Sequence, residues 1–427
     1  MHRNRLRAAA FIVLPALVAG LVGACGSGGG ESEGGKVKLR FAWWGSDTRH
    51  ELTQKVIKRF EQSHPNIDIE GEFNTWEGYW DKLGTQVAGN DAPDVIQMDW
   101  DYLRDYADRG ALLDLSGVET GDIAPQVVST GEVEGTLYAL PAGINAYTMV
   151  ADPEAFDEAG AKMPDDETWT WEDYQRIAAQ LTKDSPKGVY GAEEKGYNET
   201  SLQIFARQRG EDLYTQDGKL GVSPQIVRDW WQISLDMLAS GGTPSASTSS
   251  EVYTLGPEQS LLAKRKAAMG FWWSNQLTAL NEASGRQLEL LRYPGESAGQ
   301  PGMYFKSSQF FSVSARTEHP EEAKQFVNWL VNDRAAVEIL LSERGLPPNT
   351  KLLQQVQDKL PEVDAQVADF MADIADEVGE PPMAPPAGAD EVEAIVQRLN
   401  DEVLFKRVNT NEAASRLAQE IDSAIEP

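Results

Sequence analysis

The sequence predicts an α/β fold built on a parallel sheet, because strand and helix patterns alternate along its first folded segment. Residues 37–44 alternate apolar and other side chains with the two-residue period of a strand. Residues 52–60 then carry apolar side chains at helical spacing. Strand patterns return at 67–73 and 95–98, with a helical pattern at 80–87 between them. A β-α-β-α-β order requires right-handed crossovers, so we expect these three strands to run in parallel.

The boundaries of these elements follow from capping and turn residues. Thr48 and Glu51 have the spacing of a capping box, which predicts that the first helix starts there and ends before Pro65. Later patterns keep the α/β rhythm. We expect extended segments at 137–140, 144–150 and 267–273, helices at 171–181, 229–239, 275–283 and 321–341, two helices within 392–425, and a Ser/Thr/Gly/Pro surface loop at 241–250.

The amino terminus has the three-part layout of a secretory signal peptide, predicted to span residues 1–24. Three arginines precede an apolar run that is too short for a comfortable membrane span. The run ends in Val22-Gly23-Ala24-Cys25, which resembles the bacterial lipobox, and Cys25 is the one cysteine of the chain. We therefore expect a lipidated Cys25 and a flexible tether over residues 25–36, which hold the protein at the outer face of the cell membrane. Ordinary cleavage with an incidental Cys25 is the alternative.

The charge of the chain restricts its partners. Without residues 1–24 the chain keeps 403 residues, with 35 basic side chains against 67 acidic ones, a formal charge of −32. This field excludes nucleic acid as a plausible partner and disfavours strongly anionic ligands unless a local basic cluster meets them. The length suffices for two sizeable soluble lobes.

Four predicted strand ends offer an indole beside a short polar side chain. Ligands of open parallel sheets bind outside the carboxyl ends of the strands. Sugars present apolar C–H patches and hydroxyl groups, so a sugar site needs flat aromatic faces and a few fixed polar partners. A core role for each Trp and a capping role for each Asp are the alternatives. The candidate binding residues are Trp44, Ser46, Asp47, Trp76, Asp99, Trp100, Trp272, Trp273 and Asn275.

Enzymatic signatures are scarce in this sequence. After residue 24 only His50, His64 and His319 remain, too scattered for a convincing metal site or catalytic triad, and we expect neither metal nor cofactor. No phosphate-binding Gly-Lys loop and no HExxH motif is present. Paired carboxylates remain possible among 67 acids, so a secreted carbohydrate-cleaving enzyme stays open as the rival class.

The ordered motifs resemble the extracellular solute-binding proteins of sugar ABC importers, the maltose-binding-protein-like family. The resemblance runs from Leu39 to about Ile425 and is sharpest in short stretches. Among them are Leu39-Arg-Phe-Ala-Trp-Trp-Gly, Ala92-Pro-Asp-Val-Ile-Gln-Met-Asp, Gly110-Ala-Leu-Leu-Asp-Leu and Trp169-Thr-Trp-Glu-Asp-Tyr.

The resemblance implies a type II periplasmic-binding-protein-like fold, with two hinge-linked lobes and a ligand cleft between them. It places residues 37–143 plus 307–345 in lobe 1 and residues 144–306 plus 346–427 in lobe 2. It implies a monomer without catalysis that captures a mono- or oligosaccharide and delivers it to the membrane permease. A non-sugar solute, such as a glycerol phosphodiester, a polyamine or a peptide, is the alternative on the same fold.

The resemblance also adds residues to the candidate site. It implies that Arg49, Asn145, Tyr304 and Lys306 reach the cleft, and that either Trp272 or Trp273 stacks on the ligand. Some maltose-type relatives have an aromatic residue around positions 383–388, where this chain has Ala, Pro and Gly. The ligand therefore need not resemble maltose.

Overall fold

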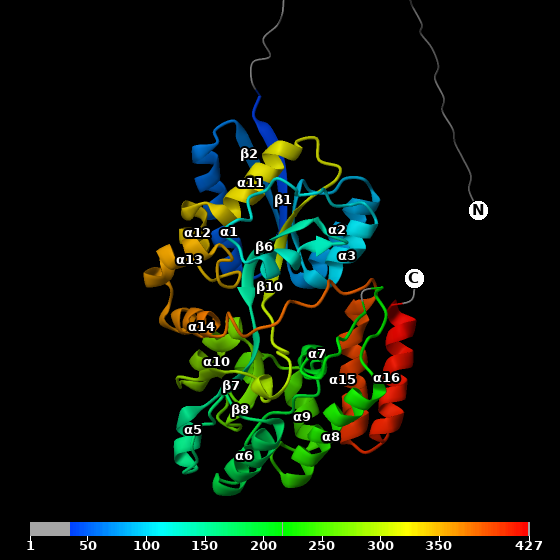
Figure 1. The fold of residues 1–427 in the computed structure, drawn as a ribbon. Coiled ribbons are helices and arrows are strands. Elements are labelled where there is room, and N and C mark those ends of the chain that lie inside the picture. Colours follow the sequence, from blue (N-terminus) through cyan, green and yellow to red (C-terminus); the bar gives the residue numbers. More distant parts are fainter. Residues whose placement is uncertain (1–34, 216, 426–427) are drawn as a thin grey trace, which may run out of the picture. The chain divides into compact units, whose positions relative to one another are not determined.

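The structure is a computed structural model that describes residues 35–215 and 217–425, without the side chains of Glu77 and Ala298. Residues 36–427 cluster as one compact unit. The predicted signal peptide and the predicted lipidation site at Cys25 lie outside the described residues. Two sheets organise the chain, and we call each sheet with its helices a lobe (Figure 1).

The first lobe is built on a five-stranded sheet of order β2-β1-β3-β10-β6. Its strands are β1 (Val37–Trp44), β2 (Ile67–Asn74), β3 (Val95–Met98), β6 (Ala139–Asn145) and β10 (Lys306–Val313). The first three run parallel, as predicted, because crossover helices connect them. Strand β10 returns from much later in the sequence and pairs antiparallel with both β3 and β6.

Helices cover this sheet and bury an aromatic core. Phe41 of β1 contacts Phe311 and Phe326 with ring centroids 5.9 and 5.5 Å apart, and Phe60 lies 4.8 Å from Phe326. All four rings are buried. The remaining elements of this lobe are α1 (Asp47–Ser63), α2 (Trp76–Ala88), α3 (Trp100–Asp108), α4 (Pro125–Ser129), β4 (Glu132–Val133), β5 (Thr136–Leu137), α11 (Pro320–Asn332), α12 (Arg334–Leu340) and α13 (Thr350–Val356).

The predicted start of the first helix is wrong by two residues. Ser46, not Thr48, is the N-cap of α1, and its hydroxyl accepts a hydrogen bond from the backbone N–H of Arg49 at 3.3 Å. Ser46 directly follows Gly45, whose φ of 147° lets the chain turn out of β1. The turn comes earlier than the capping-box spacing suggested.

The second lobe contains a three-stranded antiparallel sheet of order β8-β7-β9. Its strands are β7 (Tyr147–Ala151), β8 (Met269–Trp273) and β9 (Glu289–Leu291). Trp230 and Trp231 are fully buried in its core. The helices are α5 (Pro153–Glu158), α6 (Trp171–Asp184), α7 (Glu199–Arg207), α8 (Pro224–Ser240), α9 (Ala246–Tyr253), α10 (Leu277–Ser284), α14 (Glu362–Asp373), α15 (Val392–Leu404) and α16 (Thr410–Ile425), with short 3-10 turns η1 (Pro257–Gln259), η2 (Ser274–Gln276), η3 (Glu296–Ala298), η4 (Gln357–Lys359) and η5 (Ala389–Glu391).

Two predicted boundaries in the later chain are wrong. The Ser/Thr-rich stretch predicted as a loop contains helix α9, because Ser245 acts as its N-cap and accepts from the N–H of Thr248 at 3.3 Å. The single helix predicted over 321–341 is two helices, α11 and α12. Asp333 separates them and caps the second through a 2.7 Å hydrogen bond from Ala335 N–H.

At Leu346 the chain returns to the end of β6, near the junction of the two lobes. Ile144 and Leu346 exchange backbone hydrogen bonds of 2.9 and 3.2 Å, which ties the end of β6 to this return. Helix α13 then packs against α12, where Leu352 and Val356 contact Val337. Helix α14 packs against α10 of the second lobe. Among the described residues, no helix is long and apolar enough to cross a membrane.

The aromatic core of the first lobe generates a stability prediction. Phe60→Ala removes a fully buried ring from its contacts with Phe326 and Trp329, whose ring lies 5.3 Å away. We expect the free energy of unfolding to fall by about 3–5 kcal/mol, the usual cost of a buried Phe→Ala change. Phe405→Ala, at a ring that is 39% exposed, is the matched control and should cost much less. Urea unfolding followed by circular dichroism measures both; equal losses would contradict the assignment of Phe60 to the core.

Candidate functional site

Polar and aromatic residues gather at one edge of the first sheet. Trp44 and Asn74 pair at the carboxyl ends of β1 and β2, and Asp99 directly follows β3. Lys306 begins β10 and pairs with Asn145 at the end of β6, so the antiparallel strand starts at this same edge. Both β6 and β10 adjoin the second lobe at this edge (Figure 1). This is the edge at which the sequence predicted the ligand.

Lys306 connects the two lobes through aromatic rings. Its ammonium lies 4.8 Å from the ring centroid of Trp100 in the first lobe and 5.3 Å from that of Trp273 in the second. Trp273 in turn packs on Tyr147, with centroids 5.0 Å apart. Cation–π attraction at both rings holds the ammonium between the lobes.

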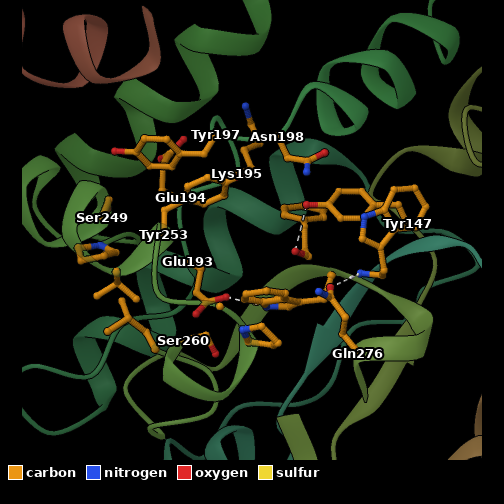
Figure 2. Close-up of a pocket in the computed structure, with 18 of the residues that line it drawn as sticks. Tyr147, Glu193, Glu194, Lys195, Tyr197, Asn198, Ser249, Tyr253, Ser260 and Gln276 are labelled. Carbon is orange, nitrogen blue, oxygen red and sulfur yellow. Dashed lines mark hydrogen bonds between the residues drawn. The ribbon is translucent and has the colours of Figure 1, made fainter. Parts of the chain in front are cut away.

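A cavity of about 340 Å³ opens beside Trp273, and we call it the aromatic cavity (Figure 2). It lies within the second lobe, between the ends of β7 and β8 and the segments 193–198 and 252–261. Tyr197 and Tyr253 stack on its wall with centroids 4.7 Å apart and an interplanar angle of 23°. Its size and lining suit a small ring-shaped ligand. The aromatic lining residues are Tyr147, Tyr197, Tyr253, Phe271, Trp272 and Trp273.

Glu193 fixes one wall of the aromatic cavity. Its two carboxyl oxygens accept hydrogen bonds from the indole N–H of Trp272 at 2.8 Å and from the backbone N–H of Leu262 at 2.9 Å. These contacts orient the Trp272 ring. Burial raises the pKa of Glu193 to about 7, and the two hydrogen bonds oppose that rise. Figure 2 shows Glu193 beside the cavity, across from Tyr197.

Lys195 lines the same cavity, but its ammonium is satisfied by the protein. It donates to the backbone oxygen of Trp230 at 2.8 Å and to the Ser234 hydroxyl at 3.2 Å, and it lies 4.2 Å from the Trp230 ring. Burial lowers the pKa of Lys195 to about 7, and the charge of Glu194 opposes that shift.

A second, smaller cavity of about 50 Å³ is lined from both lobes, and we call it the interlobe cavity. Trp100 and Asp101 of α3 face Glu199, Tyr304 and Lys306 across it. Glu393 of α15 lines both cavities, and Asn198 in the aromatic cavity directly precedes Glu199 in the interlobe cavity. The two cavities are therefore neighbours along one surface. Lys306 stands beside both, between Trp100 and Trp273.

Several buried polar atoms around the interlobe cavity lack a partner within the described residues. They are Oε2 of Glu199, Nε1 of Trp100 and Oδ1 of Asn145. Burial raises the pKa of Glu199 to about 8, with the charges of Glu393 and Asp101 adding to the rise. Burial also raises the pKa of Asp99 to about 6, and Lys306 opposes that shift. Buried polar groups are normally paired, so these atoms are available to a ligand.

The structure brings together about half of the predicted site residues. Trp272 and Trp273 line the aromatic cavity, and Trp100, Tyr304 and Lys306 line the interlobe cavity. Asn145 pairs with Lys306, and Asp99 is the N-cap of the helix that carries Trp100.

The other predicted residues line neither cavity. Trp44 is buried against the rings of Trp76, Tyr79 and Trp80 at 5.0 to 5.6 Å. Trp76 is 43% exposed at the outside of that cluster. Ser46 serves as a helix cap, and Asp47 and Asn275 are exposed at helix starts.

Arg49 has its guanidinium occupied within the first lobe. Its Nε donates to Glu343 at 2.5 Å, and one terminal nitrogen donates to the side-chain oxygen of Gln309 at 3.0 Å. These bonds attach the start of α1 to β10 and to the segment after α12. Arg49 therefore acts as a structural link in this arrangement.

Sequence reasoning missed the tyrosines and carboxyls of the second lobe. Tyr147 starts β7, two residues after the end of β6, but Tyr197, Glu199, Tyr253 and Glu393 follow no strand of the first sheet. The run 193–199, Glu-Glu-Lys-Gly-Tyr-Asn-Glu, was the available signal, because it concentrates charge and an aromatic ring immediately before a helix.

Comparison with known proteins identifies similar chains. The family model for bacterial extracellular solute-binding proteins matches residues 55–369. The Multiple sugar-binding protein of Streptococcus mutans is 23% identical over 296 residues, covering 66% of this chain and 68% of that protein. An uncharacterized lipoprotein of Streptomyces antibioticus is 25% identical over 343 residues, covering 75% of this chain and 72% of that protein.

A solved structure shares the fold over nearly the whole chain. An extracellular solute-binding protein of family 1 from Alicyclobacillus acidocaldarius superposes with a TM-score of 0.76 at 27% identity. The match covers 92% of this chain and 99% of that one. The predicted two-lobed α/β fold is thus confirmed.

The environment of Glu193 generates a pH prediction. The folded chain holds a proton on Glu193 up to about pH 7, whereas the unfolded chain loses it near pH 4.5. Through this group, the free energy of unfolding therefore falls as the pH rises from 4.5 to 7. Glu193→Gln cannot titrate, so the stability advantage of the wild type over this variant should shrink between pH 5 and pH 8. Urea unfolding at several pH values measures the difference; parallel profiles would contradict the raised pKa.

Proposed function

Because this chain belongs to the bacterial extracellular solute-binding proteins, we propose that it captures a mono- or oligosaccharide between its lobes and delivers it to the permease of an ABC importer. The observation that carries this proposal is the aromatic cavity, whose Trp and Tyr faces lie beside groups that donate and accept hydrogen bonds. Flat aromatic faces with a few fixed polar partners are what a sugar ring requires. The name of the Streptococcus mutans relative supports the same class of ligand.

We propose that the site closes by a hinge motion between the lobes. In this proposal lobe 1 comprises residues 37–143 and 307–356, and lobe 2 comprises residues 144–306 together with the chain from 357 onward, so the second segment of lobe 1 ends at 356 and not at the expected 345. Helix α13 stays with lobe 1, because it packs against α12. Trp100 would then approach a ligand that is already seated against Trp273. The permease would recognise the closed state, which a ligand stabilises only if it contacts both lobes.

Capture without catalysis is part of the proposal. Glu193 and Glu199 are buried carboxyls with raised pKa values, as in many enzymes, but Glu193 is committed to Trp272 and Leu262. We therefore expect the protein to retain an oligosaccharide in stoichiometric amount and to return it intact. Cleaved product after prolonged incubation would favour a secreted carbohydrate-cleaving enzyme instead.

A panel of carbohydrates tests the ligand class. A soluble chain starting after Cys25 is titrated with neutral pentoses, hexoses and their oligomers, and tryptophan fluorescence reports binding at Trp272 and Trp273. We expect at least one sugar to change the emission saturably. Silence across the whole panel would count decisively against carbohydrate capture.

Variants of Trp273 test its stacking role in the same titration. Trp273→Ala should weaken binding of that sugar by about 1–3 kcal/mol, as expected for an aromatic hot spot. Trp273→Phe keeps a flat face and should recover part of the loss. Thermal unfolding of both variants is the control. A large fall in melting temperature with unchanged affinity would assign Trp273 to the core instead.

The proposed monomer is held at the outer face of the membrane through Cys25. The likeness to a lipoprotein supports this anchor, as does the lipobox-like sequence before Cys25. Cys25→Ala in the full-length chain should move the protein from the membrane fraction to the soluble extracytoplasmic fraction, because no thiol is left to acylate. Immunoblots of both fractions measure the shift. Unchanged membrane association in this variant would refute lipid anchoring at Cys25.

A further inference from the structure

Acidic side chains outnumber basic side chains around the two cavities. Six carboxyl residues line the aromatic and interlobe cavities, against two lysines and no arginine. Lys195 is committed to Trp230 and Ser234, and Lys306 to the rings of Trp100 and Trp273. The carboxyl residues are Asp101, Glu193, Glu194, Glu199, Asp390 and Glu393. The lining of the two cavities is thus predominantly acidic, and Lys306, which lines the interlobe cavity, contacts aromatic rings.

Two of these carboxyl residues, Glu199 and Glu393, lie where the two cavities meet. Glu393 lines both cavities. Burial raises the pKa of Glu199, and the charge of Glu393 adds to this rise while Lys306 opposes it. Oε2 of Glu199 is buried without a hydrogen-bond partner in the described chain. A ligand cation placed here would favour ionisation of Glu199, would pair with the Glu393 carboxylate and would satisfy the unpaired oxygen.

Aromatic rings adjoin the same point. The Tyr253 hydroxyl donates to Glu393 at 3.2 Å, and the Tyr253 ring stacks on Tyr197. An ammonium group near Glu393 would therefore lie beside ring edges and faces as well as carboxylates, a combination that binds organic cations. The remaining cavity between Tyr147, Trp272 and Trp273 is free to hold the sugar ring.

We propose that the ligand is an amino sugar with a free, positively charged amine, its ring in the aromatic cavity and its ammonium group between Glu199 and Glu393. This inference rests on the proposed function and narrows it from sugars in general to cationic sugars. A neutral sugar would occupy the cavity but would bring no positive charge to pair with the carboxylates. Uronic acids and sugar phosphates would add a negative charge to this acidic lining, so we expect them to bind more weakly than the amino sugar.

Matched sugar sets test the inference. Each set keeps one ring and one linkage and places an amine, an acetamido group or a hydroxyl at carbon 2, in the gluco and galacto series, as monosaccharides and as β-1,4-linked disaccharides. Isothermal titration should show the amine member binding about tenfold or more tighter than its two partners, in the range of a charge-assisted hydrogen bond. That advantage should shrink as NaCl is raised from about 20 to 500 mM.

Charge-removing variants locate the ammonium group. Glu199→Gln and Glu393→Gln should each reduce the ratio of amine to hydroxyl affinity about tenfold, because each removes one carboxylate at the junction. Glu391→Gln is the matched control: it removes the same net charge from the exposed turn η5, two residues from Glu393, and should leave the ratio unchanged. Melting temperatures show whether each variant is folded.

The outcomes separate the two proposals. A hydroxyl or acetamido member that binds as tightly as the amine, or a ratio that neither glutamate variant changes, would overturn the amino-sugar inference and leave sugar capture intact. Absence of binding by every sugar would overturn both. Spermidine serves as an amine without a ring; binding of spermidine but of no sugar would likewise refute the proposed function and, with it, the amino-sugar ligand.

Discussion

The antiparallel pairing of β10 is the constraint on which the site depends. Had β10 entered the sheet parallel to β3, its first residue would lie at the far edge. Because it runs antiparallel between β3 and β6, Lys306 starts at the edge where β1 and β3 end. The ammonium is thereby placed between Trp100 and Trp273, rings that are 173 positions apart in sequence. The pairing of β10 thus brings one aromatic ring of each lobe, Trp100 and Trp273, into contact with the same ammonium group.

The first lobe could be predicted from the sequence because its order is local. Residues 37–98 form β-α-β-α-β with periodic patterns, and the strands at 67–74 and 95–98 were found closely. The same logic placed Asp99 and Trp100 at the carboxyl edge, whereas Lys306 was expected there only from the family resemblance. Errors came where a single side chain decides a boundary. Ser245 turns a loop-like composition into helix α9, and Asp333 divides one helical pattern into two.

The tyrosines and carboxyl groups that the second lobe adds to the site could not be predicted, because only tertiary contacts bring them together. Tyr197 and Tyr253 stack although 56 positions separate them, and no strand end marks either residue. For Trp44 the prediction failed in the opposite way, because a residue predicted to bind the ligand lies in the core. It has the sequence context of a ligand-stacking indole, yet Trp76, Tyr79 and Trp80 enclose it. Local spacing identifies which residues stand at an edge, but only packing decides whether their rings face a cavity.

Around this edge, polar groups that lack a hydrogen-bond partner are better candidates for ligand binding than polar groups that the protein already pairs. Arg49 is charged and near the cleft, but Glu343 and Gln309 already accept from its guanidinium, so a ligand would have to break existing bonds to reach it. Within the part of the chain that the structure describes, Glu199 and Asn145 each retain a buried oxygen without a partner, and Trp100 a buried N–H. An unpaired buried polar atom costs about 1–3 kcal/mol in the empty protein. A ligand that pairs with these atoms recovers this cost, and a group that the protein already satisfies offers no such gain.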